Sequence, residues 1–121
     1  MAISIEKKRF NDNLVLVIKG KVDPNDTLTI SKKIVALSKK RFKNAVVDLS
    51  NIEYLSSHWI GAFAHTWKVL HDRNKNLIFL IPKGFIRNQF TTAQLGRVFT
   101  IIESLEELDA LEDSQKEEEK Q

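Results

Sequence analysis

Cysteine is absent from this chain of 121 residues, so disulfides, thiolate nucleophiles and zinc sites built on cysteine are excluded. No apolar run is long enough to span a bilayer, and the first residues lack the apolar core of a signal peptide. A stretch with the composition of an interdomain linker is missing as well. These absences predict one cytoplasmic module without membrane insertion, and the length suits a single domain with a sizeable buried core.

The charge of the chain is unevenly distributed. Hydrophobic residues make up 42% and charged residues 29%, which is typical of a soluble folded protein, and the net charge is +3. Nine acids and two bases from Glu103 onward give this end a net charge of −7, which leaves +10 on the rest. Such a basic body attracts nucleic acid or an acidic protein partner. We favour a solvated basic surface that the acidic end partly screens, without direct nucleic-acid contact, because aromatic residues do not alternate with basic ones.

Hydrophobic periodicity divides the chain into strand and helix patterns. The predicted strands cover residues 3–10, 14–19, 45–49, 76–81 and 98–102. The first two form a hairpin through the turn formers Asn11-Asp12-Asn13. Helices are predicted after the loop 20–26, from Ser57 onward, over 85–95 and over 104–111, the last with a capping box between Ser104 and Glu107.

The resulting order ββαβαβαβα predicts an α/β fold with a mostly parallel sheet and an N-terminal antiparallel hairpin strand. Helices pack on the sheet through apolar stripes. The first stripe comprises Leu28, Ile30, Ile34, Val35, Leu37 and Phe42, and the second Ile60, Phe63, Ala64, Trp67 and Leu70. The predicted domain spans residues 1–113, and the acidic tail 114–121 is predicted to be disordered.

The junction after the strand at 45–49 carries two adjacent hydroxyls, Ser56 and Ser57. Ser50 and Asn51 are typical turn formers, so the sequence predicts that the strand ends there and that a turn leads to the serines. Either serine can cap the helix, which is the commonest role of serine at such a position. An exposed hydroxyl there also lies where backbone N–H groups and the helix dipole favour negative charge, which suits a phosphate.

The stretch from Asp48 to Gly61, DLSNIEYLSSHWIG, resembles the signature of STAS domains, the family of anti-sigma-factor antagonists and of the cytoplasmic domains of sulfate transporters. In the family pattern, a strand and Asp-Leu-Ser-Gly are followed by a few apolar residues and then by Asp-Ser-Ser-Gly-Leu-Gly, which opens a helix. The segment Gly20-Lys21-Val22-Asp23 is similar to the Gly-Glu-Leu-Asp turn of the family. The predicted order of elements is similar over nearly the whole chain.

The resemblance implies a bacterial signalling protein that regulates transcription by binding an anti-sigma factor. In this family the partner has a histidine-kinase-like fold and acts as a serine protein kinase on the antagonist, which is then released; a phosphatase restores binding. Matched residue by residue, Ser57 falls on the serine that is phosphorylated. The implied partner-binding residues are Asp23, Asn25, Ser56, Ser57, His58, Trp59 and Gly61.

Three residues around Ser57 depart from the family pattern. Ser56 stands in place of an aspartate, His58 in place of a second serine and Trp59 in place of a glycine. The Trp59 ring either packs on its own domain, beside the buried stripe of the helix, or is exposed as an anchor for a different partner. A tryptophan at this position favours an alternative function, a non-switching STAS subunit of a larger assembly such as an ABC-type lipid transporter or a stress-signalling scaffold.

No catalytic set accompanies the motif. His58 and His65 are separated by about 10 Å along a helix, which is too far to share one metal ion. Asp23 and Asp48 lie near the serines without a paired base or a glycine-rich loop. We therefore expect no enzyme, no metal and no cofactor. A small enzyme on a parallel sheet remains as a further alternative, which turnover of a nucleotide by the isolated protein would reveal.

Overall fold

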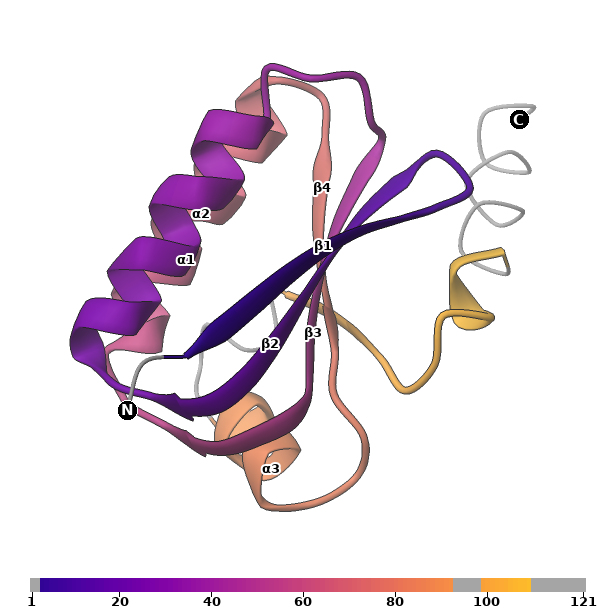
Figure 1. Ribbon diagram of the computed structural model, residues 1–121. Coiled ribbons are helices and arrows are strands. Elements are labelled where there is room, and N and C mark those ends of the chain that lie inside the picture. Colours follow the sequence, from indigo (N-terminus) through magenta and orange to yellow (C-terminus); the bar gives the residue numbers. More distant parts are fainter. Residues whose placement is uncertain (1–2, 93–98, 110–121) are drawn as a thin grey trace.

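The computed structural model describes residues 3–92 and 99–109. In this part of the chain, five strands form one mixed sheet in the order β1-β2-β3-β4-β5 (Figure 1). The strands are β1 (Ser4–Phe10), β2 (Asn13–Val22), β3 (Asn44–Leu55), β4 (Asn76–Leu80) and β5 (Thr100–Ile102). The helices are α1 (Pro24–Leu37), α2 (Trp59–Asp72) and α3 (Phe85–Thr92), and a helical turn at 107–109 ends the described chain.

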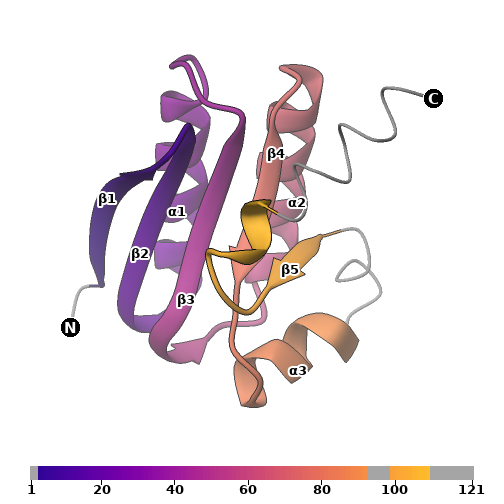
Figure 2. The same cartoon turned by 90° about the vertical axis from the view of Figure 1, so that its right-hand side faces the viewer.

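The topology follows from how the strands are connected. β1 and β2 are joined by a tight hairpin turn and pair antiparallel, whereas β2, β3, β4 and β5 are parallel to their neighbours and each connection between them carries a helix. Helices α1 and α2 lie side by side on one face of the sheet, and the turn at 107–109 lies on the other (Figure 2). The predicted α/β fold and its order ββαβαβαβα are confirmed. Within the described residues, every helix is too short or too polar to cross a membrane.

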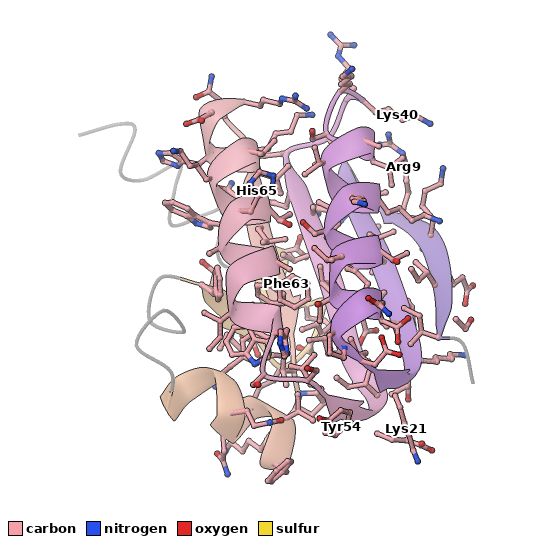
Figure 3. The ribbon with its side chains drawn as sticks, turned by 90° about the vertical axis from the view of Figure 1, so that its left-hand side faces the viewer. Arg9, Lys21, Lys40, Tyr54, Phe63 and His65 are labelled. Atoms are coloured by element: carbon pink, nitrogen blue, oxygen red, sulfur yellow. The ribbon has the colours of Figure 1, made fainter. Side chains whose placement is uncertain are left out.

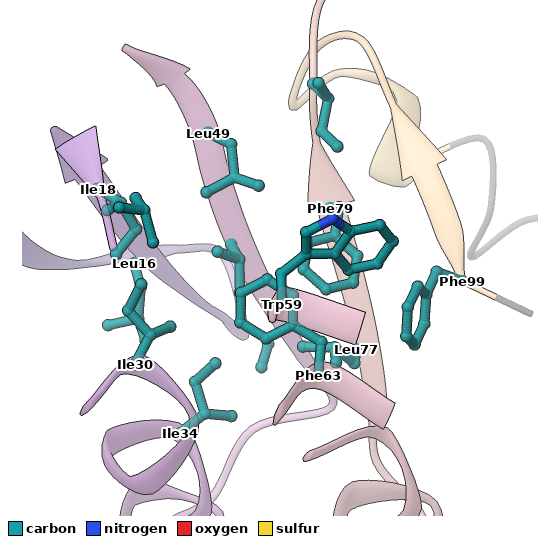
Figure 4. Close-up of a cluster of buried hydrophobic side chains, with 14 of the residues drawn as sticks. Leu16, Ile18, Ile30, Ile34, Leu49, Trp59, Phe63, Leu77, Phe79 and Phe99 are labelled. Atoms are coloured by element: carbon teal, nitrogen blue, oxygen red, sulfur yellow. The ribbon is translucent and has the colours of Figure 1, made fainter. Parts of the chain in front are cut away.

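The sheet is buried on both faces, which explains why the sequences of β3 and β4 begin without alternation. The larger apolar cluster lies between the sheet and the two long helices, and part of it is shown in Figure 4. The smaller cluster lies on the opposite face and consists of Val15, Val17, Val46, Ile78, Leu80, Ile102 and Leu108. The segment after β5 covers part of this second face through Leu105 and Leu108, so the first halves of β2 and β3 are buried on both sides.

An asparagine ladder crosses the sheet where β2, β3 and β4 begin. Asn44 donates from Nδ2 to Oδ1 of Asn13 at 2.7 Å, and its own Oδ1 accepts from Nδ2 of Asn76 at 2.9 Å. Asn13 donates in turn to the backbone carbonyl of Phe10 at 3.1 Å. Asn13 and Asn44 are buried, so these amides depend on one another for their hydrogen bonds. The ladder therefore helps to fix the relative register of three strands.

Replacing Asn44 with alanine is expected to lower the free energy of unfolding by about 2–3 kcal/mol, because Oδ1 of Asn13 would lose its donor while remaining buried. Asn76→Ala is the control at the exposed end of the ladder; it removes the donor to Oδ1 of Asn44, but water can replace that donor at this end, so we expect a cost of about 1 kcal/mol or less. Urea denaturation of both variants measures the difference. Equal losses of unfolding free energy in the two variants would show that burial of the Asn44 amide does not increase its contribution to stability.

β3 is longer than the sequence predicts, and the predicted end of the strand at residue 49 is wrong. The strand runs through Ser50 and Asn51, where the sequence predicts a turn, and ends at Leu55. β2 pairs with β3 as far as Leu55, opposite Val22, whereas β4 pairs with β3 only as far as Asp48. Backbone pairing with β2 therefore outweighs the local turn preference of Ser50 and Asn51.

α1 also differs from its predicted extent. The predicted loop 20–26 is instead the end of β2 followed by the first turn of α1, which begins at Pro24 and ends at Leu37. Phe42 consequently lies beyond the helix, and Leu28 is 53% exposed although the periodicity assigned it to the apolar stripe. The buried residues of the helix are Thr27, Ile30, Ser31 and Ile34.

The C-terminal helix predicted over 104–111 is described only as the turn at 107–109, and residues 110–111 and the predicted disordered tail 114–121 lie outside the described residues. Of the predicted capping box between Ser104 and Glu107, the structure gives a single side-chain bond, and it is made with Glu103 instead of Ser104. The Glu107 carboxylate accepts a hydrogen bond from the backbone N–H of Glu103, at 3.0 Å. The acid still satisfies a backbone donor ahead of the helical turn.

Candidate functional site

The serine junction connects the end of β3 to the start of α2. The backbone N–H of Ser56 donates to the carbonyl of Val22 at 2.9 Å, so β2 holds the chain for one residue beyond β3. The N–H of Trp59 donates to the carbonyl of Ser56 at 3.1 Å and closes the turn that leads into α2. The junction lies at the carboxyl ends of the parallel strands, the edge where open α/β sheets usually place functional residues.

The two serines have opposite environments. Ser56 is 3% exposed, and its hydroxyl accepts from the backbone N–H of His58 at 3.4 Å and lies 3.1 Å from Nδ1 of that residue. Ser57 is exposed, and within the described part of the chain its hydroxyl has no hydrogen-bond partner. Neither serine is the N-cap of α2, which is His58, without a hydrogen bond from its side chain to the helix. Ser56 thus supports the turn, and Ser57 is the hydroxyl that a partner can reach.

Trp59 packs inside its own domain. It is 2% exposed, and its ring stacks on Phe90 of α3 with 3.9 Å between the centroids. The centroids of Phe63 and Phe99 lie 6.3 and 6.1 Å from it. Figure 4 shows the indole among the rings of Phe63, Phe79 and Phe99. Of the two placements that the sequence leaves open for this ring, the structure has the buried one, and the first residue of α2 is thereby fixed to the core.

The start of α1 lies beside the junction, because Val22 and Leu55 are paired at the ends of β2 and β3. Asp23 is the N-cap of α1, and its carboxylate accepts from the N–H of Asp26 at 2.9 Å. The Asp26 carboxylate accepts from the N–H of Asp23 at 3.0 Å, which completes a capping box. Asn25 is exposed in the same first turn. The structure therefore brings both predicted partner-binding segments to one end of the sheet.

The seven residues that the resemblance implies for partner binding fall into two groups. Five are exposed at this end of the molecule: Asp23, Asn25, Ser57, His58 and Gly61. Ser56 and Trp59 are buried, so their side chains support the surface from beneath. The exposed group is polar, and the buried group holds the turn on which it is displayed.

Three exposed apolar residues at the same end are absent from the set implied by the sequence. Leu28, Tyr54 and Phe85 are 53%, 51% and 74% exposed, and they lie just after the first turn of α1, at the end of β3 and in the first turn of α3. The start of α1, the end of β3 and α3 all lie in the lower half of Figure 1, and Figure 3 labels Tyr54 at the corresponding end. Tyr54 stands within the motif and could have been chosen from the sequence. Leu28 could not have been chosen, because the hydrophobic periodicity of the helix predicts that its side chain is buried.

Gly61 lies in the first turn of α2 and is exposed. A Cβ added there would meet no atom within 4 Å. The fold therefore does not require a glycine at this position, and its small size matters only for what approaches the helix from outside.

The histidines do not form a metal site. His58 and His65 are both exposed, and no group of three potential ligands occurs among the described residues. His71 stacks on Trp67 with 4.9 Å between the ring centroids, in the last turn of α2. Asp48 accepts a hydrogen bond from the N–H of Ser50 at 2.9 Å and is thus engaged locally within β3.

Comparison with known proteins places these features in a family context. A family model described as the STAS domain matches residues 4–108. An anti-sigma-B factor antagonist from Staphylococcus epidermidis is 25% identical over 101 residues, which cover 84% of this chain and 85% of the relative. The crystal structure of an anti-sigma factor antagonist from Mycobacterium paratuberculosis has a TM-score of 0.77 at 20% identity and covers 90% of this chain and 93% of its own. The Bacillus cell fate determinant SpoIIAA in its phosphorylated form has a TM-score of 0.65 at 18% identity, with coverages of 91% and 99%.

Proposed function

Because the chain belongs to the STAS domain family, we propose that it is an antagonist of a kinase-type anti-sigma factor and is released when that partner phosphorylates Ser57. The observation that carries the proposal is the exposed hydroxyl of Ser57, without a hydrogen-bond partner in the described part of the chain, on a turn whose neighbours are fixed. The relatives from Staphylococcus epidermidis and Mycobacterium paratuberculosis are named as antagonists of anti-sigma factors and not as enzymes. A regulatory role without catalysis agrees with those names.

The surface around Ser57 has the composition of a protein-binding site. Exposed polar groups at Ser57 and His58, and the exposed apolar side chains of Leu28, Tyr54 and Phe85, belong to elements that begin or end at the same end of the sheet. Interfaces commonly combine a few aromatic or aliphatic anchors with a polar rim. The apolar residues supply contact area, and Ser57 supplies the group that the partner modifies.

Phosphorylation would change this surface without disturbing the fold beneath it. A phosphoserine carries about −1.5 to −2 charges at neutral pH. Ser57 lies two residues before the first residue of α2, where the helix dipole favours negative charge, so the modified chain is not destabilised locally. A partner surface that fits a neutral hydroxyl would instead face a desolvated charge, which costs binding free energy.

The test is to offer the folded protein to kinase-type anti-sigma factors from the same genome and to measure binding by calorimetry. We expect one of them to form a complex that dissociates after ATP is added. Mass-spectrometric mapping should then place the phosphate on Ser57 and not on Ser56, whose hydroxyl is buried. Lack of binding to all of them would contradict the proposal, and phosphate on another residue would contradict the switch alone.

A second function is a non-switching STAS subunit of a larger assembly, such as an ABC-type lipid transporter or a stress-signalling scaffold. The packing of Trp59 favours it, because the ring stacked on Phe90 gives the junction a fixed support that serves a permanent contact equally well. Such a subunit would bind its partner regardless of the state of Ser57. Variants that change the charge at Ser57 separate the two functions.

Gly61 provides a separate test of the contact surface. Gly61→Ala is expected to raise the free energy of unfolding by about 0.5–1 kcal/mol, since the added Cβ meets open space in a helix. Gly61→Phe should also fold but should weaken partner binding at least tenfold, because a ring would stand beside Ser57. Lys68→Phe, at an exposed position further along α2, is the matched control and should bind normally. Equal binding by both phenylalanine variants would exclude the start of α2 from the interface.

A further inference from the structure

The inward face of β1 changes character halfway along the strand. Ile3 and Ile5 pack against the larger core cluster, and strand alternation puts Lys7 and Arg9 on the same face. β1 is an edge strand, and inward-pointing cations on such a strand hinder pairing with another sheet. That protective role does not require any space beneath the cations.

A cavity of about 180 Å³ nevertheless lies beneath this half of β1. It is lined by residues 7–9 of β1 and by Leu14, Leu37, Lys40 and Phe42. Leu14 and Phe42 are buried and Leu37 is half-buried, so the floor is apolar. The cations stand at the rim, because Lys7 and Lys40 are exposed.

The surroundings of the cavity are strongly positive. Arg9 donates from Nη2 to the carbonyl of Arg41 at 2.9 Å, which joins β1 to the segment that carries Phe42. On the other side, Nζ of Lys75 lies 3.9 Å from the centroid of the Phe42 ring. Burial and the neighbouring Arg73 guanidinium lower the pKa of Lys75, as expected where cations gather.

Among the described residues, one of the lining cations has an acid within ion-pair distance: Glu6 lies 4.0 Å from Lys8 on the edge of β1. Asp12 lines an adjoining depression that shares Arg9 and Phe42 with the cavity. The residues that line the cavity itself include four cations and no acid. Figure 3 shows Arg9 and Lys40 together at the end of the molecule opposite Tyr54, so this cavity is separate from the Ser57 surface.

From this geometry we infer that the cavity binds a small amphipathic anion, a carboxylate or phosphate joined to a short apolar body. The anionic group would meet Lys7, Arg9 and Lys40, and the body would rest on Leu14 and Phe42. The volume is below the range of about 300–1,000 Å³ that is typical of pockets for drug-sized ligands, so the apolar body is expected to be small. The inference does not depend on the proposed antagonist function.

Phenyl phosphate and phenylacetate are suitable probes, and backbone amide shifts in NMR titrations report both affinity and location. We expect at least one of the two to bind with millimolar or tighter affinity and to shift the amides of residues 7–9 and 40–42. Benzyl alcohol, which lacks the charge, and inorganic phosphate, which lacks the apolar body, should each bind at least tenfold more weakly. The relative strength of the two anionic probes identifies phosphate or carboxylate as the preferred group.

The variant that tests the rim is Lys7→Gln with Lys40→Gln, which leaves the hydrogen bond of Arg9 intact. It should weaken binding of the better probe at least tenfold, whereas Lys33→Gln with Lys68→Gln, on exposed helix surfaces, should not. If both double variants weakened probe binding equally, the effect would come from the overall charge of the protein, and the inference would be overturned. The inference would also be overturned if high concentrations of both anionic probes left the amides of residues 7–9 unshifted. Equal affinities for inorganic phosphate and for the better anionic probe would overturn it too.

Discussion

Replacing Trp59 with alanine is expected to lower the free energy of unfolding by about 3–5 kcal/mol, the usual cost of removing a large aromatic side chain from a core. The ring is 2% exposed and stacks on Phe90, so its removal leaves a cavity where α2, α3 and the sheet meet. A domain of this size is usually stable by about 5–15 kcal/mol. The loss would therefore be a large part of the total free energy of unfolding. Trp59→Gly, which restores the glycine of the family pattern, should lower the free energy of unfolding by up to about 1 kcal/mol more than Trp59→Ala does.

Urea denaturation measures the effect, provided that the dependence of the unfolding free energy on urea concentration is the same in all variants. The chain offers a matched control on the same helix. Trp67 is half-buried and stacks on His71, so Trp67→Ala should cost clearly less than Trp59→Ala. Trp59→Phe should retain part of the stacking on Phe90 and lie between wild type and alanine. A loss below 1 kcal/mol for Trp59→Ala, or a loss equal to that of the control, would show that the indole does not anchor α2.

Replacing Ser57 with aspartate is expected to weaken binding to the anti-sigma partner by about 100-fold or more, equivalent to about 2.8 kcal/mol. A carboxylate at this position brings a charge into an interface that fits a neutral hydroxyl, and such a charge costs desolvation free energy. Stability should change by no more than about 0.5 kcal/mol, because the side chain is exposed and its hydroxyl has no partner in the described part of the chain.

Asparagine is the matched control at position 57, since it has the shape of aspartate without the charge. Ser57→Asn and Ser57→Ala should both bind within about threefold of wild type in calorimetric titrations, and neither should accept phosphate from the partner. Equal binding by the aspartate and asparagine variants would reject the phosphorylation switch. It would favour the non-switching subunit, whose contact is independent of charge at Ser57.

The order of elements could be predicted because it depends on local hydrophobic periodicity, which the chain displays clearly. The length of β3 could not, because Ser50 and Asn51 favour a turn in isolation and become strand only through pairing with β2. Leu28 was misassigned for a related reason. Periodicity places it near the apolar stripe of α1, but only the assembled fold shows that its side chain is 53% exposed.

The candidate site was predictable in its location but not in its orientation. The motif indicates both serines, yet the turn geometry alone decides that Ser56 faces inward and Ser57 outward. The position of the Trp59 ring depends on Phe90 and Phe99, which are distant in sequence and contact it only in the folded chain. Local patterns carry no information about such partners.

The unequal pairing of β3 has a consequence for motion at the junction. Beyond Asp48 the strand is hydrogen bonded to β2 but not to β4, so its amides depend on a single neighbour. Local opening of this half costs less free energy than opening of the half that is paired on both sides, and its amide hydrogens should exchange faster. Ser57 thus lies two residues beyond the half of β3 that is expected to open more readily, while Trp59 is buried in the core. A kinase that draws Ser57 into its active site can therefore displace a short stretch of chain and leave the rest of the sheet intact.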